Sequence, residues 1–328
     1  NKIAKCYGRC TIMRVFGPVP SRRLGRSVGI NNIPPKVCTY SCVYCQLGST
    51  LKMTMDRKVF FQPEEILKEV EEKVSEVKKF DETIDYLTFV PDGEPTLDLN
   101  LGTEISLLKQ EFDIKIAIIT NSSLIWRDDV KEELTKADLV SFKIDAVAKN
   151  TWKRINRPYG KLELDKIIGG ILEFSENYQG KLITETMLVR GINDNKDWLN
   201  NIADYIAQIN LDTAYIAIPT RPPAENWVKS PDEEHINLAY QIFNKKVKNA
   251  EYLISYEGNV FSFTGDVENN ILSITSVHPM RKDALEEFLN KANSDWGVVK
   301  KLIAQKEVVE LVYEGKTFYM RNLHKANN

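Results

Sequence analysis

Residues 63–96 read PEEILKEVEEKVSEVKKFDETIDYLTFVPDGEPT, and this stretch contains one complete helix and strand. Apolar side chains recur at helical spacing from Ile66 to Val77, which predicts an amphipathic helix over Pro63–Lys79. A short apolar run at 84–90 follows and predicts a strand that is covered on both faces. The turn residues Asp92 and Gly93 end this strand. A helix followed by a buried strand is the repeating unit of an α/β fold with a parallel sheet.

The same alternation extends on both sides of this stretch. Further helices are predicted at 101–112, 128–137, 162–177, 196–209 and 232–247. The predicted strands lie at 27–31, 84–90, 115–120, 139–144, 182–189 and 213–218. Six strands that each precede a helix favour an α/β fold of the parallel (βα)6-type, a partial TIM barrel. In such folds the working residues lie at the carboxyl ends of the strands.

The sequence changes character after about residue 255. Helices are predicted at 266–278, 281–292 and 295–306, followed by two strands within 308–323 around Glu314-Gly315-Lys316. Three helices and a hairpin predict a small C-terminal winged-helix-like domain. We therefore expect an N-terminal extension at 1–12, the barrel at 13–255 and this domain at 256–328. The domain either caps the barrel or binds substrate, because a fold alone does not set function.

Composition excludes several classes of protein. The 328 residues include 44 Lys and Arg against 46 Asp and Glu, so the formal charge is −2 and bulk charge alone would not hold nucleic acid. No apolar run is long enough to span a bilayer and no secretory signal pattern is present, so we expect a cytoplasmic protein without a membrane partner. The sequence also lacks a Walker A loop, a G-x-S-x-G elbow and a G-x-G-x-x-G fingerprint.

The five cysteines are the chemical landmark of the chain. Cys38, Cys42 and Cys45 lie within eight residues, after the first predicted strand, whereas Cys6 and Cys10 lie near the start of the sequence. A cubane iron–sulfur cluster needs four iron ligands, so a loop with three thiolates leaves one iron open. An open position distinguishes a catalytic metal site from a closed structural one. The alternative is a structural zinc site with a distant fourth ligand.

The spacing C-x-x-x-C-x-aromatic-C resembles the signature of the radical S-adenosylmethionine (radical SAM) superfamily. Residues 92–96, DGEPT, are similar to the Gly-Gly-Glu-Pro segment of that superfamily, with Asp92 in place of the first glycine. The resemblance implies that Cys38, Cys42 and Cys45 hold a [4Fe–4S] cluster whose open iron binds S-adenosylmethionine (SAM). It further implies reductive cleavage of SAM to a 5′-deoxyadenosyl radical, which abstracts hydrogen from a substrate.

The same resemblance implies a set of contacts to SAM. Glu94 and the backbone near Gly93 are expected at the methionine ammonium, which requires carboxylate or carbonyl acceptors. The candidate SAM contacts are Tyr44, Gly93, Glu94, Asn121, Lys143 and Asp145, with Thr184 and Arg190 as further candidates. For Lys143 and Asp145 an ordinary ion pair at the barrel rim is the alternative.

A narrower resemblance covers nearly the whole chain. The segments 16–25 (FGPVPSRRLG), 42–48 (CVYCQLG), 155–158 (INRP) and 221–225 (RPPAE) are similar to an archaeal and bacterial radical SAM family grouped with the tRNA wyosine synthases. That family implies a tRNA-modifying reaction. Wyosine synthases carry a second cluster on further upstream cysteines, whereas this sequence offers only Cys6 and Cys10 there, and two thiolates cannot close a cubane site alone. The wyosine reaction itself is therefore in doubt.

Arginines in the loops between the predicted elements are candidates to bind the substrate. Arginine suits bidentate contacts to phosphate or carboxylate, and Tyr159 and Trp227 are placed in the sequence where they can stack on a base. The alternative is that these segments are rigid turns with solvated charges. The candidate substrate residues are Arg22, Arg23, Arg26, Arg154, Arg157, Arg221 and Glu225.

These observations lead to one function and two alternatives. The expected function is that of a radical SAM enzyme that modifies a tRNA or RNA base, with a ferredoxin or flavodoxin as electron donor. One alternative is radical modification of a peptide, protein or small metabolite. The other is a non-catalytic iron–sulfur or zinc RNA-binding protein, which would hold metal without turning over SAM.

Overall fold

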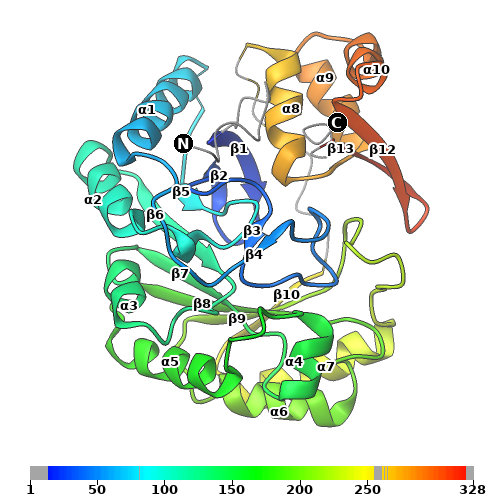
Figure 1. Cartoon of the computed structure of the whole chain (residues 1–328). Coiled ribbons are helices and arrows are strands. Elements are labelled where there is room, and N and C mark those ends of the chain that lie inside the picture. Colours follow the sequence, from blue (N-terminus) through cyan, green and yellow to red (C-terminus); the bar gives the residue numbers. More distant parts are fainter. Residues whose placement is uncertain (1–13, 81, 255–260, 262, 264, 323–328) are drawn as a thin grey trace.

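The computed structural model describes residues 14–322 apart from 81, 255–260, 262 and 264. Its centre is a curved eight-stranded sheet with the strand order β1-β2-β5-β6-β7-β8-β9-β10 (Figure 1). Neighbouring strands are parallel except at the edge, where β1 runs antiparallel to β2. The strands are β1 Val15–Ser21, β2 Gly25–Ile30, β5 Tyr86–Phe89, β6 Lys115–Thr120, β7 Leu139–Lys143, β8 Lys181–Met187, β9 Thr213–Ala217 and β10 Ala250–Leu253. The predicted α/β partial barrel is confirmed.

Helices cover the outer face of the sheet (Figure 1). They are α1 Pro63–Lys79, α2 Leu101–Glu111, α3 Asp128–Leu134, α4 Lys149–Ile155, α5 Leu164–Asn177, α6 Lys196–Ile206 and α7 Glu233–Lys246. Helix α1 has the predicted bounds and begins at a capping box in which Gln62 and Glu65 bond each other's backbone. Its buried face contains Ile66, Val70 and Val74, as the sequence periodicity predicts. Helix α4 was not predicted.

The inner face of the sheet has a small apolar cluster of its own. Ala117 of β6, Leu139 of β7 and Ile183 of β8 belong to it, together with Leu24 and Leu253. Side chains alternate between the two faces of a strand, so the residues next to these in sequence face the helices instead. The cluster closes the inside of the barrel and leaves the carboxyl ends of the strands open to a cavity.

The C-terminal part of the chain packs around a separate core, which includes Ile271, Phe288 and Leu302. Its sheet has the order β11-β13-β12, and Val19 of β1 packs against its core. The elements are α8 Val267–Val277, β11 Met280–Arg281, α9 Lys282–Lys291, α10 Trp296–Ala304, β12 Val308–Tyr313 and β13 Lys316–Arg321. Three helices and a hairpin are thus present as expected, with β11 added. The predicted boundary near residue 255 lies outside the described residues, as do Cys6, Cys10 and the rest of the predicted extension.

None of the helices in the described part of the chain is long and apolar enough to cross a membrane.

Candidate active site

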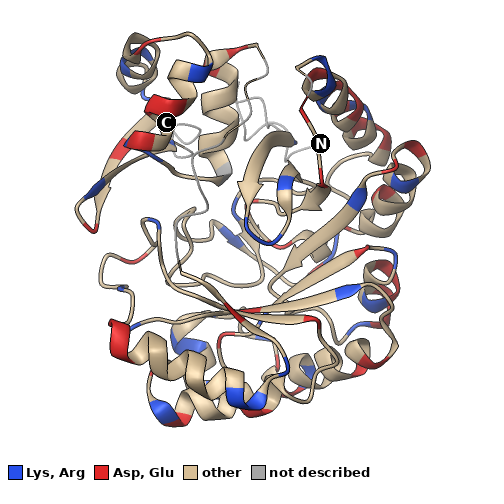
Figure 2. Cartoon of the chain, turned by 180° about the vertical axis from the view of Figure 1, so that it is seen from behind, with Lys and Arg blue, Asp and Glu red and all other residues tan. Residues whose placement is uncertain are grey.

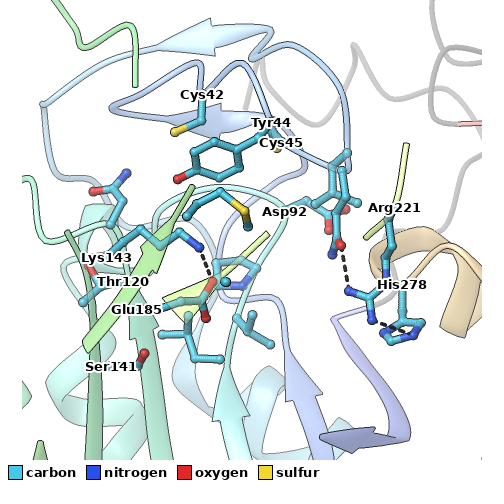
Figure 3. A pocket seen from close by; sticks show the side chains of 18 of the residues that line it. Cys42, Tyr44, Cys45, Asp92, Thr120, Ser141, Lys143, Glu185, Arg221 and His278 are labelled. Carbon is cyan, nitrogen blue, oxygen red and sulfur yellow. Dashed lines mark hydrogen bonds and ion pairs between the residues drawn. The ribbon is translucent and has the colours of Figure 1, made fainter. Parts of the chain in front are cut away.

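A cavity of about 360 Å³ lies at the carboxyl ends of the parallel strands. Its wall includes Thr88 of β5, Ser141 and Lys143 of β7, Glu185 of β8 and the three clustered cysteines. Figure 3 shows Cys42 and Cys45 across the cavity from Ser141 and Glu185. The cavity therefore lies where active sites of parallel α/β folds lie.

The cysteines belong to a loop that is closed at its base. The two-residue strands β3 Val37–Cys38 and β4 Lys52–Met53 pair in parallel, and the loop runs between them. Inside the loop the Cys45 amide donates to the Cys42 carbonyl at 3.1 Å, and the Lys36 ammonium donates to the Gly48 carbonyl at 2.6 Å. The backbone of the loop is thus fixed by its own hydrogen bonds, and all three cysteines line the cavity.

The environment of the thiols favours metal binding over free thiolates. Burial, with a smaller contribution from Glu94, raises the pKa of Cys38 to about 12. Burial and Asp145 raise the pKa of Cys42 as well. Thiolates at these positions need a positive charge beside them, which iron would supply.

Two amide groups donate hydrogen bonds to the sulfur atoms. Asn121 Nδ2 lies 3.5 Å from Cys38 Sγ, and Asn156 Nδ2 lies 3.4 Å from Cys42 Sγ. Hydrogen bonds to the sulfurs tune the reduction potential of iron–sulfur clusters. Asn121 was predicted at the site, whereas Asn156 was not, although it lies in the family-like segment 155–158.

The cysteines are not gathered around one metal ion. In the described ranges no group of three or more His, Cys, Asp or Glu side chains is placed to hold a metal ion. A zinc ion requires four ligands around one centre, whereas each cysteine of a cubane binds a different iron. Three cavity-lining thiols thus fit a cluster as the donor set.

The loop after β5 packs directly against the cysteine loop. The Glu94 amide donates to the Val37 carbonyl at 3.2 Å, and the Lys36 amide donates to the Asp92 carbonyl at 2.7 Å. A Cβ atom at Gly93 would lie 1.9 Å from the Val37 carbonyl oxygen, so only glycine fits there. Residues 92–94 therefore set the position of the strand that carries Cys38.

Glu94 connects the loop after β5 to the end of β6 and is not among the described residues of the cavity wall. Its carboxylate accepts hydrogen bonds from the Thr96 amide and hydroxyl, from the Thr120 hydroxyl at 2.6 Å, and from the Asn121 amide at 2.7 Å. Among the described residues the cavity is lined by Asp92 and Gly93 but not by Glu94. Of residues 92–94, Asp92 and Gly93 are therefore the two that face the cavity.

Asp92 is a buried carboxylate that faces the cavity. Asp92 is 4% exposed, and its Oδ1 atom has no hydrogen-bond partner within the described part of the chain. Burial raises the pKa of Asp92 to about 7, against the opposing charges of Lys36 and Arg321. An unpaired buried acceptor is costly unless a ligand supplies a donor.

Tyr44 and Asp145 form a buried pair beside the cysteines. The Tyr44 hydroxyl donates to Asp145, which also accepts from Asn156 Nδ2 at 2.7 Å and from the Met187 amide at 2.8 Å. Lys143 Nζ lies 5.2 Å from the centre of the Tyr44 ring. Tyr44 and Lys143 line the cavity, whereas Asp145 lies behind Tyr44 and is not among the described lining residues.

Charged residues meet on the cavity wall at Glu185. Its carboxylate forms ion pairs with Lys143 and with Arg23, so the expected alternative of a Lys143–Asp145 pair is wrong. Burial opposes the negative charge, but Arg23 and Lys143 outweigh it and hold the pKa of Glu185 at about 2. The group carries two positive charges and one negative charge at neutral pH.

The predicted site residue on β8 is displaced by one position. Thr184 is fully buried but does not line the cavity, because alternation on β8 puts Ile183 and Glu185 on the inner face. On β8 it is therefore Glu185 and not Thr184 that lines the cavity, and sequence reasoning did not single out Glu185. Alternation from the apolar Ile183 was the signal that pointed to it.

Arg221 lies on the cavity wall after β9, as predicted. Its guanidinium donates to Gln46 Oε1 at 2.8 Å, and the other terminal nitrogen lies 3.0 Å from His278 Nε2 (Figure 3). His278 comes from the end of α8, so the C-terminal part contributes to the cavity. Neither Gln46 nor His278 was predicted, since the contact joins residues far apart in sequence.

Arg23 and Arg221 line the cavity, whereas the remaining predicted arginines are not among its described lining residues. Arg22 donates to the Tyr252 carbonyl at 3.0 Å, Arg26 pairs with Glu82, and the exposed Arg190 donates its amide to the Lys229 carbonyl. Arg22, Arg26, Arg154, Arg157, Arg190 and Glu225 are not among the described residues that line the cavity, and Arg157 and Glu225 form an ion pair with each other.

Comparison with known proteins identifies the family. The model of the Radical SAM superfamily matches residues 32–205, more than half of the chain. The chain belongs to the radical SAM superfamily. Members of this superfamily use a [4Fe–4S] cluster and SAM, and the chain is accordingly an enzyme.

Two curated relatives cover nearly the whole chain. The UPF0026 protein MJ1312 of Methanocaldococcus jannaschii is 49% identical over 94% of this chain and 96% of the relative. A protein of Brachyspira hyodysenteriae named GTPase Obg is 33% identical over 97% of this chain, which spans only 47% of that protein.

Solved radical SAM structures share the fold. A radical SAM methyltransferase from Sphaerobacter thermophilus superimposes with a TM-score of 0.56 at 15% identity, covering 70% of this chain and 67% of the other. A structure of TYW1 with a lysine–pyruvate adduct bound has a TM-score of 0.50 at 16% identity, covering 68% and 74%. Identities this low show that the barrel fold is shared, and they do not indicate the substrate of this chain.

Proposed function

We propose that Cys38, Cys42 and Cys45 hold the [4Fe–4S] cluster of this enzyme and that SAM binds beside it in the cavity. The observation that carries the proposal is that all three cysteines line one cavity at the carboxyl ends of the strands. The bound cluster and SAM together supply a 5′-deoxyadenosyl radical, which takes a hydrogen atom from the substrate.

The residues of the chain would then have distinct tasks. Asn121 and Asn156 donate hydrogen bonds to two of the sulfur atoms, which favours the thiolate form. Asp92 Oδ1 and the Gly93 backbone offer acceptors for the SAM ammonium group. Tyr44, fixed by Asp145, provides a flat surface next to the third cysteine for the adenine.

The cysteine loop also has to receive an electron from outside. A reduced ferredoxin or flavodoxin is the proposed donor, since these are small carriers with low potentials. Leu51, at the end of the loop that holds the cysteines, is 55% exposed and offers an apolar contact there.

The proposed substrate is a base of tRNA or another RNA. The loop after β9 supports this, because it reaches from the cavity wall at Arg221 to Trp227, which is 50% exposed. The Glu225 amide donates to the Val43 carbonyl at 3.1 Å, so the loop is anchored to the cysteine loop. An exposed tryptophan beside a catalytic cavity can stack on an unpaired base.

Charges of both signs are mixed over the outer surface, so a contact with RNA would have to be local. Figure 2 shows Lys and Arg interspersed with Asp and Glu along the outer helices. We propose that the part containing α8, β11, α9, α10, β12 and β13 is a winged-helix-like domain at 256–328 and forms the second contact region for RNA. The hairpin meets the β9 loop where the Tyr313 hydroxyl donates to the Pro219 carbonyl at 3.3 Å.

A small charged metabolite is the second candidate substrate. The group of Arg23, Glu185 and Lys143 on the cavity wall favours it, because such a group offers both signs of charge to a zwitterion. A peptide terminus or side chain has the same chemistry.

Deuterium transfer distinguishes these substrates. The reduced enzyme is incubated with SAM and with RNA transcribed from deuterated nucleotides, or with deuterated amino acids and organic acids. We expect deuterium in 5′-deoxyadenosine only with RNA. Trp227→Ala should weaken RNA binding about tenfold, because it removes the stacking interaction with one base. It should leave the basal cleavage of SAM unchanged. Deuterium transfer from a metabolite, with none from RNA, would establish the second candidate instead.

A further inference from the structure

Among the described residues of the C-terminal part, His278 is the one that lines the cavity. This histidine ends α8, where its amide donates to the Ile274 carbonyl at 2.8 Å. It has 5% exposure, and its ring makes an edge contact with Phe261 at 5.2 Å between centres. The position of the side chain is thus fixed by the C-terminal core.

The contact of His278 continues to the cysteine loop. Burial, reinforced by the Arg221 charge, holds the pKa of His278 well below its ordinary value, so the ring is neutral and Nε2 accepts from Arg221. The other terminal nitrogen of Arg221 donates to Gln46, the residue after Cys45. One guanidinium therefore joins the end of α8 to the neighbour of a cysteine (Figure 3).

A second contact holds the same loop. Tyr313 at the end of β12 donates from its hydroxyl to the Pro219 carbonyl, two residues before Arg221. The C-terminal part thus contacts the loop after β9 through both His278 and Tyr313. The planar guanidinium of Arg221 gives its hydrogen bond to Gln46 a defined direction.

We infer that His278 is a positioning residue for the cysteine loop: it holds Arg221, and through Arg221 it fixes Gln46 and the segment that carries Cys45. The C-terminal domain then forms part of the active site and stabilises it, rather than serving only as a separate substrate-binding domain. The inference rests on the proposed function only in taking this loop as the cluster loop. Mutation of residues that position metal ligands through hydrogen bonds commonly lowers metal affinity by about 10- to 100-fold.

Hydrogen exchange of the full chain tests the inference without any turnover. In His278→Ala the amides of residues 41–48 should exchange about tenfold faster than in the wild type, because the loop opens more often. His278→Gln places an amide oxygen near the position of Nε2 and should restore slow exchange. Iron release to a chelator from the reconstituted protein should follow the same order of variants.

A double-mutant cycle shows whether His278 acts through Arg221. If it does, His278→Ala adds nothing to the exchange rate of Arg221→Ala, because the two residues form one contact. His235→Ala is the matched control, since His235 is partly exposed and bonds Asp232 on α7; it should leave exchange of residues 41–48 unchanged.

Two results would overturn the inference. One is wild-type exchange of residues 41–48 in His278→Ala; the other is an effect of His278→Ala that adds in full to that of Arg221→Ala. Failure of the proposed function would be seen separately, as absence of SAM cleavage by the wild-type protein.

Discussion

Two cations outweigh the cost of burying Glu185. The carboxylate lies on the cavity wall with Arg23 on one side and Lys143 on the other, and its side chain retains 9% exposure. Removing one partner of a buried ion pair leaves the other charge buried without compensation. The free-energy cost of this is larger than the stabilisation that the intact pair provides. Glu185 thus keeps two cations in place at the strand ends, where a substrate or SAM would meet them.

Glu185→Gln should lower the free energy of unfolding at neutral pH by about 3 kcal/mol. The pKa of Glu185 is about 2, below its ordinary value of 4.5, so the ionised form is stabilised by folding. This contribution is complete above pH 4.5 and is lost as the pH falls toward 2. Denaturant unfolding of both proteins from pH 7 to 3 measures it. A difference between them that grows on acidification would contradict this assignment.

Single residues differ in how far the sequence predicts them. Cys38, Cys42 and Cys45 are recognisable because their spacing is local and chemically specific, and Asn121 because it follows a strand. Asn156, Gln46 and His278 act through contacts with residues distant in sequence or through an orientation that only the fold defines. Gln46 and Asn156 lie in family-like segments, but those segments do not indicate these contacts.

At the scale of elements, the β5 loop and the cysteine loop depend on one glycine. Gly93→Ala would drive a Cβ into the Val37 carbonyl and displace β3, so we expect a loss of roughly 2 kcal/mol in unfolding free energy and a loss of bound iron. Gly169→Ala is the control, because nothing lies within 4 Å of its Cβ position in α5 and it should stabilise by about 0.5–1 kcal/mol. Iron content and chemical unfolding measure both. Wild-type iron content in Gly93→Ala would refute the tight contact.

The alternation of β8 makes a second prediction. Thr184 is buried and its hydroxyl has no partner within the described ranges, so Thr184→Val should raise the free energy of unfolding by about 1 kcal/mol without changing SAM affinity. Thr186→Val on the same face should instead lower it by about 1 kcal/mol, since the Thr186 hydroxyl donates to the Ile144 carbonyl at 2.9 Å. Calorimetric titration with SAM is the second measurement. Severalfold weaker SAM binding by Thr184→Val would place that side chain in the site after all.

Long periodic elements were predictable and very short ones were not. The period of apolar residues over Pro63–Lys79 defines α1 in both bounds. Strands β3 and β11 have two residues each, too few to show alternation, and the exposed Glu251 interrupts the short edge strand β10. These strands exist because tertiary contacts hold them, which a local pattern does not contain.

At the scale of the whole molecule, curvature of the sheet brings the site together. Arg23 near the start of the chain, Glu185 on β8 and His278 beyond the barrel line the same cavity although they are far apart in sequence. The sequence predicted a partial barrel and a small C-terminal domain, because the order of elements is local information. It did not predict that α8 delivers a side chain to the cavity, since that depends on how the two parts pack.

The central claim is that the three clustered cysteines hold a cluster that cleaves SAM. The most direct measurement is anaerobic reconstitution with iron and sulfide, reduction with dithionite in the presence of SAM, and detection of 5′-deoxyadenosine. The wild type should form it, and Cys38→Ala, Cys42→Ala and Cys45→Ala should each lose both iron and product, while the matched control Cys6→Ala/Cys10→Ala retains both. A variant of any of the three clustered cysteines that keeps its iron and forms 5′-deoxyadenosine at the wild-type rate would contradict the claim.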